Sequence, residues 1–326
     1  MYTNLVMETS FLVGKLLPLV ELTCGCRLEL RARSLFAADV SSGAIGCAAL
    51  LHAEMEVSEE EEAAMSRAAP LASLRIVVFH LSDEHERFST RGYDLARVVL
   101  RNYASPRADR AANVAYLLEG ANGTGGSGET RVFWLPLGHS EAFLEMPVLK
   151  HATSARAYAW SWAGSTQGKP RRMEFLEGVR RYTQVNLLGV GRLHTYEGFY
   201  DPTAVLRPSM YSAWLHQSRV APCPDGGSAE QFRVYEALAA GAVPMVSADH
   251  PHLSYLDTLG FRALRVKSWA ADAPGMLDAA ANDKGFVDAL QDMQATNDRV
   301  LQLVTKNAQR FVATTICKAA LGAPRE

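Results

Sequence analysis

Residues 219–247 read RVAPCPDGGSAEQFRVYEALAAGAVPMVS, and this stretch decides the fold. A short apolar run at 220–224 is followed by the turn-forming sequence Asp-Gly-Gly. Ser228 and Gln231 match the Ser-x-x-Gln capping box, so we expect a helix to begin at Ser228. Good helix formers follow, with apolar side chains at helical spacing. The first part of the stretch therefore predicts a strand, a glycine-rich turn and a helix.

The second part of the stretch adds another strand. Gly241 is placed to end the helix, because glycine adopts the left-handed C-cap conformation without steric cost. Residues 243–246 read Val-Pro-Met-Val, and Pro244 stands near the start of this strand, where a missing N–H is tolerated. Strand, helix and strand make a parallel β-α-β unit. Such sheets bind ligands at the carboxyl ends of their strands, with phosphate oxygens facing the free N–H groups of a helix start.

Arg233 and Glu236 are the charged residues of the predicted helix that suit a nucleotide sugar. They are three residues apart and therefore share one face of the helix. The arginine can bind a diphosphate and the glutamate can accept hydrogen bonds from ribose hydroxyls. The alternative is an exposed ion pair on an ordinary helix, and the spacing alone leaves both interpretations open.

The run from Ser228 to Pro244, with FRVYEALAAGAVP at 232–244, resembles the signature of the exostosin-type glycosyltransferases. These are glycosyltransferase family 47 and relatives such as the ribitol xylosyltransferase. The resemblance implies an α/β fold with two Rossmann-like domains facing a cleft, the GT-B type, which the alternating strands and helices also favour. It implies transfer of a hexose or pentose from a nucleoside diphosphate, expected to be UDP, to a glycan hydroxyl with inversion. A retaining GT-B transferase and a non-catalytic nucleotide- or glycan-binding relative are the alternatives.

A second part of the nucleotide-sugar site is expected at the start of the second domain. AYAWSW at 157–162 predicts a strand, and Ala163-Gly164-Ser165 predicts the turn after it. Basic residues follow this turn, and a helix is expected at 173–182. The resemblance implies a donor contact for Arg171 or Arg172, and a basic surface turn is the alternative. The residues predicted to bind the nucleotide sugar are Gly164, Ser165, Arg171, Arg172, Gly227, Ser228, Arg233 and Glu236.

The catalytic base is expected in the first domain. The apolar run at 74–81 predicts a buried parallel strand, and Asp83 and Glu84 follow its carboxyl end. A base must lie within hydrogen-bond reach of the acceptor hydroxyl, and these two carboxylates are the best placed by sequence. His80 and His139 are held in reserve. No Asp-x-Asp motif occurs, so we expect no metal and no cofactor besides the UDP-sugar as donor substrate.

Three segments divide the 326 residues: an acceptor-side Rossmann-like domain at 1–154, a nucleotide-sugar-binding domain at 155–270, and closing helices at 271–326. Further strands are expected at 98–103 and 132–137 in the first segment, and at 185–190 and 261–266 in the second. The region from Gly191 to Pro208 is expected to be a loop, and an acidic run at 54–62 a solvated helix face or linker.

Composition excludes some partners. The net charge of −2 provides no basic field for nucleic acid, and no apolar run approaches the length of a membrane span. Enzymes of the exostosin type are anchored in the Golgi, so the resemblance implies the Golgi lumen. This chain shows no anchor or signal, and we expect either a piece of a longer protein or a cytoplasmic one. Five cysteines cannot all pair with one another, and Cys24 and Cys26 are expected to be buried thiols or a local disulfide.

Overall fold

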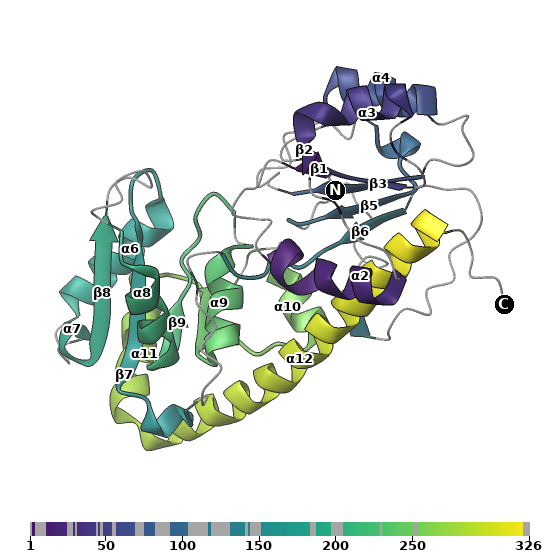
Figure 1. The fold of residues 1–326 in the computed structure, drawn as a ribbon. Coiled ribbons are helices and arrows are strands. Elements are labelled where there is room, and N and C mark those ends of the chain that lie inside the picture. The colour runs from purple at the N-terminus through teal and green to yellow at the C-terminus, as the bar shows by residue number, and fades with distance from the viewer. Residues whose placement is uncertain are drawn as a thin grey trace. The chain divides into compact units, whose positions relative to one another are not determined.

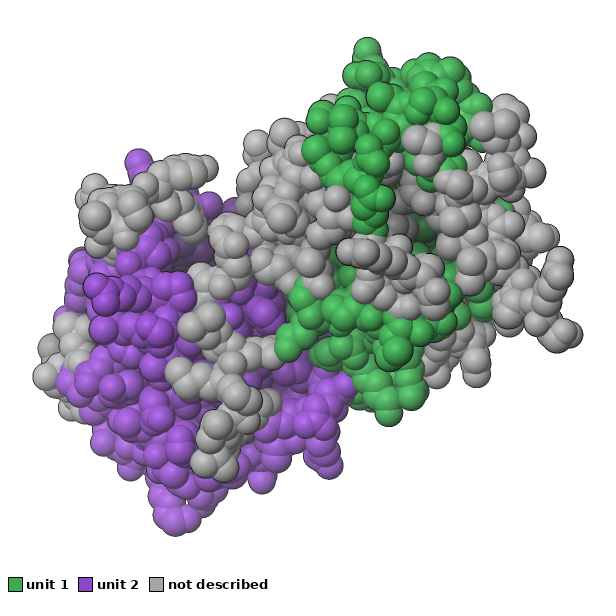
Figure 2. Space-filling view, viewed as in Figure 1, with its two compact units in different colours: residues 1–137, 303–326 green, residues 138–302 purple. Residues whose placement is uncertain are grey.

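The chain divides into two compact units. Unit 1 comprises Met1–Leu137 and Leu303–Glu326, and unit 2 comprises Gly138–Gln302. Figure 2 colours them separately. We analyse a computed structural model, and it describes residues 2–3, 11–24, 29, 31–43, 45, 48–53, 57–68, 75–81, 92–103, 117–118, 131–140, 143, 151–182, 187–196, 205–228, 230–248, 250 and 253–321.

Unit 1 is built on a six-stranded sheet in which all neighbouring strands pair in parallel, in the order β2-β1-β3-β4-β5-β6. The strands are β1 (Tyr2–Thr3), β2 (Arg31–Ala32), β3 (Ala48–Ala53), β4 (Arg75–His80), β5 (Val98–Arg101) and β6 (Arg131–Trp134). The apolar runs predicted as strands at 74–81, 98–103 and 132–137 are therefore confirmed as β4, β5 and β6. Their β-branched residues suit strands that are covered on both faces.

Helices cover both faces of this sheet (Figure 1). The helical elements are the π-helix η1 (Leu12–Leu16), α2 (Leu17–Cys24), the 3₁₀ turns η2 (Arg33–Leu35) and η3 (Tyr93–Leu95), α3 (Phe36–Ser42), α4 (Glu59–Ala68) and the end of α12 (Lys284–Leu321). Phe36 of α3 and Met65 of α4 are fully buried against Val78 and Val99 of the sheet. Phe311 of α12 packs on Phe133, with ring centroids 4.7 Å apart. Val132 precedes Phe133 in β6 and packs on the opposite face of the sheet, against the core that contains α3 and α4. Successive side chains of a strand point to opposite faces.

A disulfide fastens the end of α12 to α2 within unit 1. Cys24 and Cys317 are 293 residues apart in sequence, and their Cα atoms are 5.3 Å apart. The expectation of buried thiols or a local disulfide was wrong for Cys24, because α12 returns its last turns to this unit. Gln309 of α12 also donates a 2.9 Å hydrogen bond to the carbonyl of Lys15. Among the described cysteines, Cys223 is free and buried.

Residues 59–62 of the acidic run belong to α4, and one of their glutamates is not solvated. Glu61 is 6% exposed and receives two hydrogen bonds of 2.7 Å from the guanidinium of Arg33. Glu61 also accepts a 2.8 Å bond from the Ser58 N–H, while Ser58 Oγ accepts one from the Glu61 N–H. This is a capping box, which satisfies two N–H groups at the helix start. Burial acts to raise the pKa of Glu61, but the bonds from Arg33 and Ser58 outweigh it and lower the pKa below its ordinary value.

We expect Glu61→Gln to lower the free energy of unfolding by about 1–3 kcal/mol at neutral pH, because charge-assisted hydrogen bonds are lost. A carboxyl group whose pKa is lowered by folding stabilises the folded state at pH values above its ordinary pKa. This stabilisation is lost as the pH falls through the folded-state pKa. The difference between wild type and variant should therefore shrink as the pH falls below the ordinary glutamate pKa. Urea denaturation at several pH values measures it. Glu60→Gln, at an exposed position of the same helix, is the matched control, and an equal loss in both variants would contradict the prediction.

Unit 2 has a five-stranded parallel sheet in the order β11-β10-β9-β7-β8. The strands are β7 (Tyr158–Ser165), β8 (Gly191–Tyr196), β9 (Ser218–Pro222), β10 (Val243–Ser247) and β11 (Leu264–Val266). The strand order reverses between β7 and β9, and such a switch point is where open α/β sheets bind ligands. Both units consist of parallel strands and helices, which confirms the predicted α/β class with two Rossmann-like domains.

The helical elements of unit 2 are η4 (Thr153–Ala155), α6 (Pro170–Arg181), α7 (Leu187–Val190), α8 (Pro208–His216), α9 (Phe232–Ala240), α10 (Ser254–Leu259), α11 (Asp272–Asn282) and the first part of α12. Its core joins α6 and α11 to the sheet through large aromatic side chains, namely Trp160, Trp162, Phe175 and Trp269. The strand expected at 185–190 was wrong: residues 187–190 are helical, and the strand is β8, within the region expected to be a loop.

Arg156, just before β7, forms hydrogen bonds with three separate segments of unit 2. Its guanidinium donates to the carbonyls of His151, Ser218 and Ala240, at 3.1, 2.8 and 3.1 Å. The residue is 2% exposed, and burial lowers its pKa to about 10 while Asp298 acts in the opposite direction. The guanidinium is therefore charged at neutral pH.

The division into units differs from the three predicted segments. Residues 138–154 group with unit 2, and the predicted closing segment 271–326 is divided between the two units. Hydrogen bonds give the physical reason for the first difference. The Thr153 hydroxyl donates to Gln294 of α12 at 2.5 Å, and the Ser140 hydroxyl donates to Glu236 of α9 at 2.6 Å.

Candidate functional site

The loop between β9 and α9 is held by side chains rather than by a capping box. Helix α9 begins at Phe232, and its N-cap is Gln231, with no side-chain bond to the helix. Gln231 is extended and donates instead to the carbonyl of Cys223 at 3.0 Å, across the loop. Ser228 Oγ accepts from the N–H of Glu230. The predicted helix start at Ser228 was therefore wrong, whereas Gly241 ends α9 in the left-handed conformation as predicted.

Arg233 points from α9 to the carboxyl end of β7. Its guanidinium donates to the carbonyl of Ala163 and lies 5.2 Å from the ring centre of Trp162 and 5.9 Å from that of Tyr211. The Nη1 atom is buried and has no hydrogen-bond partner among the described residues. A methyl group at Gly164 would lie 3.1 Å from this guanidinium, so glycine leaves it room. Arg233 thus retains donor capacity beside the switch point.

Glu236 is 3% exposed and already accepts several hydrogen bonds. Ser140 donates to Oε1 from both its N–H, at 3.2 Å, and its hydroxyl, at 2.6 Å. Tyr211 donates its hydroxyl to Oε2. No ion pair joins Glu236 to Arg233 within the part of unit 2 that the structure describes, so the alternative of an exposed ion pair does not apply.

The second predicted element is a strand and a helix start, but its bounds differ. Gly164 and Ser165 belong to β7 rather than to a turn, and α6 starts at Pro170, so both arginines lie in its first turn. Arg172 is buried and donates to the carbonyl of Ser165 at 2.8 Å. Arg171 is 53% exposed at its side chain and pairs with Glu174 at 2.9 Å. Arg172 is thus buried against the end of β7, and Arg171 is the more accessible cation.

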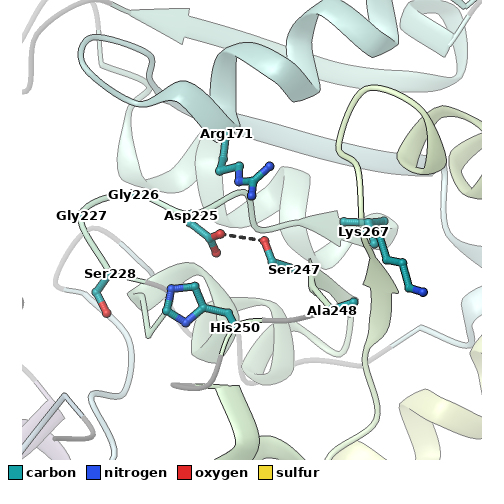
Figure 3. Close-up of a pocket in the computed structure, with 10 residues that line it drawn as sticks. Arg171, Asp225, Gly226, Gly227, Ser228, Ser247, Ala248, His250 and Lys267 are labelled. Atoms are coloured by element: carbon teal, nitrogen blue, oxygen red, sulfur yellow. Dashed lines mark hydrogen bonds between the residues drawn. The ribbon is translucent and has the colours of Figure 1, made fainter. Parts of the chain in front are cut away.

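A hollow of about 350 Å³ lies at the carboxyl ends of β9, β10 and β11 (Figure 3). Loop residues Asp225 to Ser228 follow β9, and Arg171 reaches it from α6. Its remaining lining residues follow the other two strands: Ser247, Ala248, His250, Val266 and Lys267. In the view of Figure 3, Asp225 and Ser247 lie between Arg171 and His250. The hollow therefore combines cationic side chains with an aspartate and a glycine-rich loop.

A chain of hydrogen bonds runs behind this hollow. Trp269 Nε1 donates to Ser247 Oγ at 3.0 Å, and Ser247 Oγ donates to Asp225 Oδ2 at 2.7 Å. Burial raises the pKa of Asp225, although the bond from Ser247 and the charges of His250, Arg171 and Arg172 act to lower it. Ser247 Oγ thus accepts a hydrogen bond from the indole N–H and donates its own hydrogen to the aspartate.

The structure brings part of the predicted set to the hollow and leaves part elsewhere. Arg171, Gly227 and Ser228 line it, and Arg172 lies directly behind, with its guanidinium 2.7 Å from where a methyl group at Gly226 would be. Gly164, Ser165, Arg233 and Glu236 belong to the same unit but do not line the hollow. The prediction missed Asp225, Ser247 and Lys267 as lining residues. Ser247 ends β10, and Asp225 and Lys267 follow β9 and β11, so the rule that ligands bind at carboxyl ends could have found them.

The predicted base residues in unit 1 cannot be placed in the same way. Asp83 and Glu84 lie outside the described residues. Of the reserve residues, His80 ends β4 and is buried, with its Nδ1 atom hydrogen-bonded to the hydroxyl of Tyr93. His139, in unit 2, has its Nδ1 atom 3.1 Å from the carbonyl of Ser140.

No protein-family model and no curated protein sequence matches the chain. Solved structures similar to it include the α,α-trehalose-phosphate synthase (UDP-forming) from Burkholderia vietnamiensis, at 13% identity and a TM-score of 0.49, covering 99% of this chain and 85% of that one. WaaG, a glycosyltransferase involved in lipopolysaccharide biosynthesis, matches at 11% identity and a TM-score of 0.44, over 89% and 95%. The pneumococcal O-GlcNAc transferase GtfA, solved with UDP and GlcNAc, matches at 12% identity and a TM-score of 0.45 over 86% of this chain, which spans 59% of GtfA. Each is a likeness in fold.

None of the helices in the described ranges has an apolar segment that could span a bilayer. Within the same ranges, no three histidine, cysteine, aspartate or glutamate side chains converge as a metal site would require.

Proposed function

We propose that the chain is a glycosyltransferase that binds a nucleoside diphosphate sugar in the hollow of unit 2. The observation that carries this proposal is the convergence of Arg171, Lys267 and the loop Gly226–Ser228 at the carboxyl ends of neighbouring parallel strands. Cations and backbone N–H groups of a glycine-rich loop are the groups that stabilise a diphosphate. The same groups stabilise the negative charge that develops on the leaving diphosphate during transfer.

The finer assignments come from the resemblance to exostosin-type enzymes. UDP is the proposed nucleoside diphosphate, a glycan hydroxyl the acceptor, and inversion the stereochemical course, with Asp83 or Glu84 as the base. Glu236 is the proposed ribose ligand. Its carboxylate accepts hydrogen bonds from Ser140 and Tyr211, so ribose hydroxyls would have to share or replace them. Arg233, with its buried Nη1 atom, is the proposed second cation for the diphosphate.

The compartment is also a proposal. A disulfide between Cys24 and Cys317 favours an oxidising environment, because thiols of cytosolic proteins are kept reduced. The Golgi lumen implied by the resemblance meets this condition.

A binding and turnover panel tests the proposed function. Purified protein is titrated with UDP, GDP and ADP by calorimetry, and then incubated with UDP-sugars and glycan acceptors. Transfer of sugar, with the anomeric configuration of the product read by NMR, supports the transferase and separates inversion from retention. Nucleotide binding without transfer would favour a non-catalytic binding protein, and the absence of any nucleotide binding would refute the site.

We expect Arg171→Ala to weaken UDP binding about tenfold, because one charge-assisted hydrogen bond to phosphate is lost. Calorimetry measures the dissociation constant, and raising the salt concentration should weaken the wild type more than the variant. Arg180→Ala is the matched control, since Arg180 is exposed on the same helix and does not line the hollow. Equal affinities for all three proteins would remove Arg171 from the site.

A further inference from the structure

Asp225 has one carboxylate oxygen for which the described residues provide no hydrogen bond. Oδ2 accepts a hydrogen bond from the hydroxyl of Ser247, but Oδ1 is buried and has no hydrogen-bond partner among the described residues. Buried polar atoms are nearly always hydrogen-bonded, and leaving one unsatisfied costs about 1–3 kcal/mol. A carboxylate kept at this cost in the wall of a hollow points to a partner that arrives with a ligand.

The orientation of Asp225 is fixed from behind. Trp269 donates to Ser247, and the hydroxyl of Ser247 donates in turn to Asp225. Trp269 is 1% exposed and packs in the core of unit 2, which holds this chain of bonds in place. Asp225 does not cap the following helix, because the N-cap of α9 is Gln231. The aspartate is thus a preorganised acceptor without a structural role at the helix start.

The ligand that fits must carry two kinds of group. Arg171 and Lys267 require an anion, whereas Asp225 requires an N–H or O–H donor in the same hollow. A nucleoside phosphate supplies both, through its phosphates and through an imide N–H or a ribose hydroxyl of its nucleoside. An inorganic diphosphate supplies the anion but has neither the imide N–H nor the ribose hydroxyls of a nucleoside.

We propose that Asp225 is a specificity-determining residue of the donor site, whose Oδ1 atom accepts a hydrogen bond from the nucleoside part of the ligand. This inference rests on the proposed function, in that it assumes a nucleotide in the hollow. It goes beyond the proposed function by assigning the recognition of the nucleoside to one side chain of the hollow. Ser247 and Trp269 are positioning residues that act through Asp225.

Asp225→Asn is the direct test, because the amide keeps the shape of the carboxyl and places a donor where an acceptor is needed. We expect the dissociation constant for UDP, measured by calorimetry, to rise about tenfold to a hundredfold. The constant for pyrophosphate should stay unchanged. UDP methylated at the imide nitrogen and 2′-deoxy-UDP, tested on the wild type, distinguish the base from the ribose as the donor. Ser247→Ala should cause a smaller loss for UDP, because it removes only the orienting bond.

The control is Asp292→Asn, at an exposed position of α12 outside the hollow, with thermal unfolding to verify that each variant is folded. If the wild type binds neither UDP nor pyrophosphate, the proposed function itself fails. If the wild type binds UDP and Asp225→Asn binds it equally well, the site stands and the role of Asp225 is overturned. A folded Asp225→Asn variant that loses UDP and pyrophosphate alike would also overturn it, since the residue would then shape the whole hollow.

Discussion

Reducing the Cys24–Cys317 disulfide should lower the free energy of unfolding of unit 1 by about 5 kcal/mol. The bond closes a loop of 293 residues, and the loss of unfolded-chain entropy on closing a loop grows with its length. Hydrogen exchange followed by mass spectrometry, with and without reductant, measures the effect on peptides of β4, β5 and α12. Protection in these peptides should fall steeply, while peptides of the unit 2 sheet should change less.

The matched control for this experiment is the double variant Cys24→Ser with Cys317→Ser. It should be as unstable as the reduced wild type, and reductant should change it no further. A non-reduced peptide map should also contain the cross-linked pair. Pairing of Cys24 with Cys26 in that map, or an unfolding curve of the wild type that reductant leaves unmoved, would contradict the prediction.

Arg156→Ala should be the most destabilising single substitution we expect in unit 2, at about 3–5 kcal/mol. It leaves the carbonyls of His151, Ser218 and Ala240 without their donor and opens a cavity beside them. An unsatisfied buried acceptor costs about 1–3 kcal/mol, although such terms do not simply add. The three carbonyls belong to the entry into η4, to the start of β9 and to the last residue of α9, so their loosening affects the sheet on which the hollow is built.

Chemical denaturation followed by tryptophan fluorescence measures this loss, since Trp160, Trp162 and Trp269 report from the core of unit 2. Arg156→Lys should lie between wild type and Arg156→Ala, because an ammonium group keeps the charge but cannot reach three carbonyls in a fixed plane. Arg180→Ala, which removes an exposed arginine, should change stability little. If Arg156→Ala lowers the free energy of unfolding no more than Arg180→Ala does, the buried hydrogen bonds of Arg156 do not stabilise unit 2.

The strands that sequence analysis predicted correctly are the ones with a uniform environment. β4 and β5 are buried on both faces, and such strands read as continuous runs of apolar, β-branched residues. The strand at Gly191–Tyr196 was missed because β8 is the edge of its sheet and is only half-buried, with histidine, threonine and tyrosine among its residues. The apolar residues just before it, Leu187–Val190, form a helical turn that packs on the same core.

The candidate site shows the same limit at the level of single side chains. A candidate site at the carboxyl ends of parallel strands could be predicted, because chain order and turn residues indicate where those strand ends lie. The proposed role of Asp225 could not, since it depends on Ser247 and on Trp269, which come from later parts of the chain. The start of α9 was misplaced for a related reason: Gln231 bonds to the carbonyl of Cys223 across the loop instead of closing a local capping box. The disulfide likewise joins residues too far apart for local spacing to indicate.

The bond between Cys24 and Cys317 closes residues 24–317 into a covalent ring. A single protease cut anywhere inside the ring therefore opens it without releasing a fragment. The nicked protein keeps its mass on a non-reducing gel and separates into two pieces only after a thiol is added. A cleavage site at which the nicked protein keeps its function is also a site at which new chain termini can be engineered.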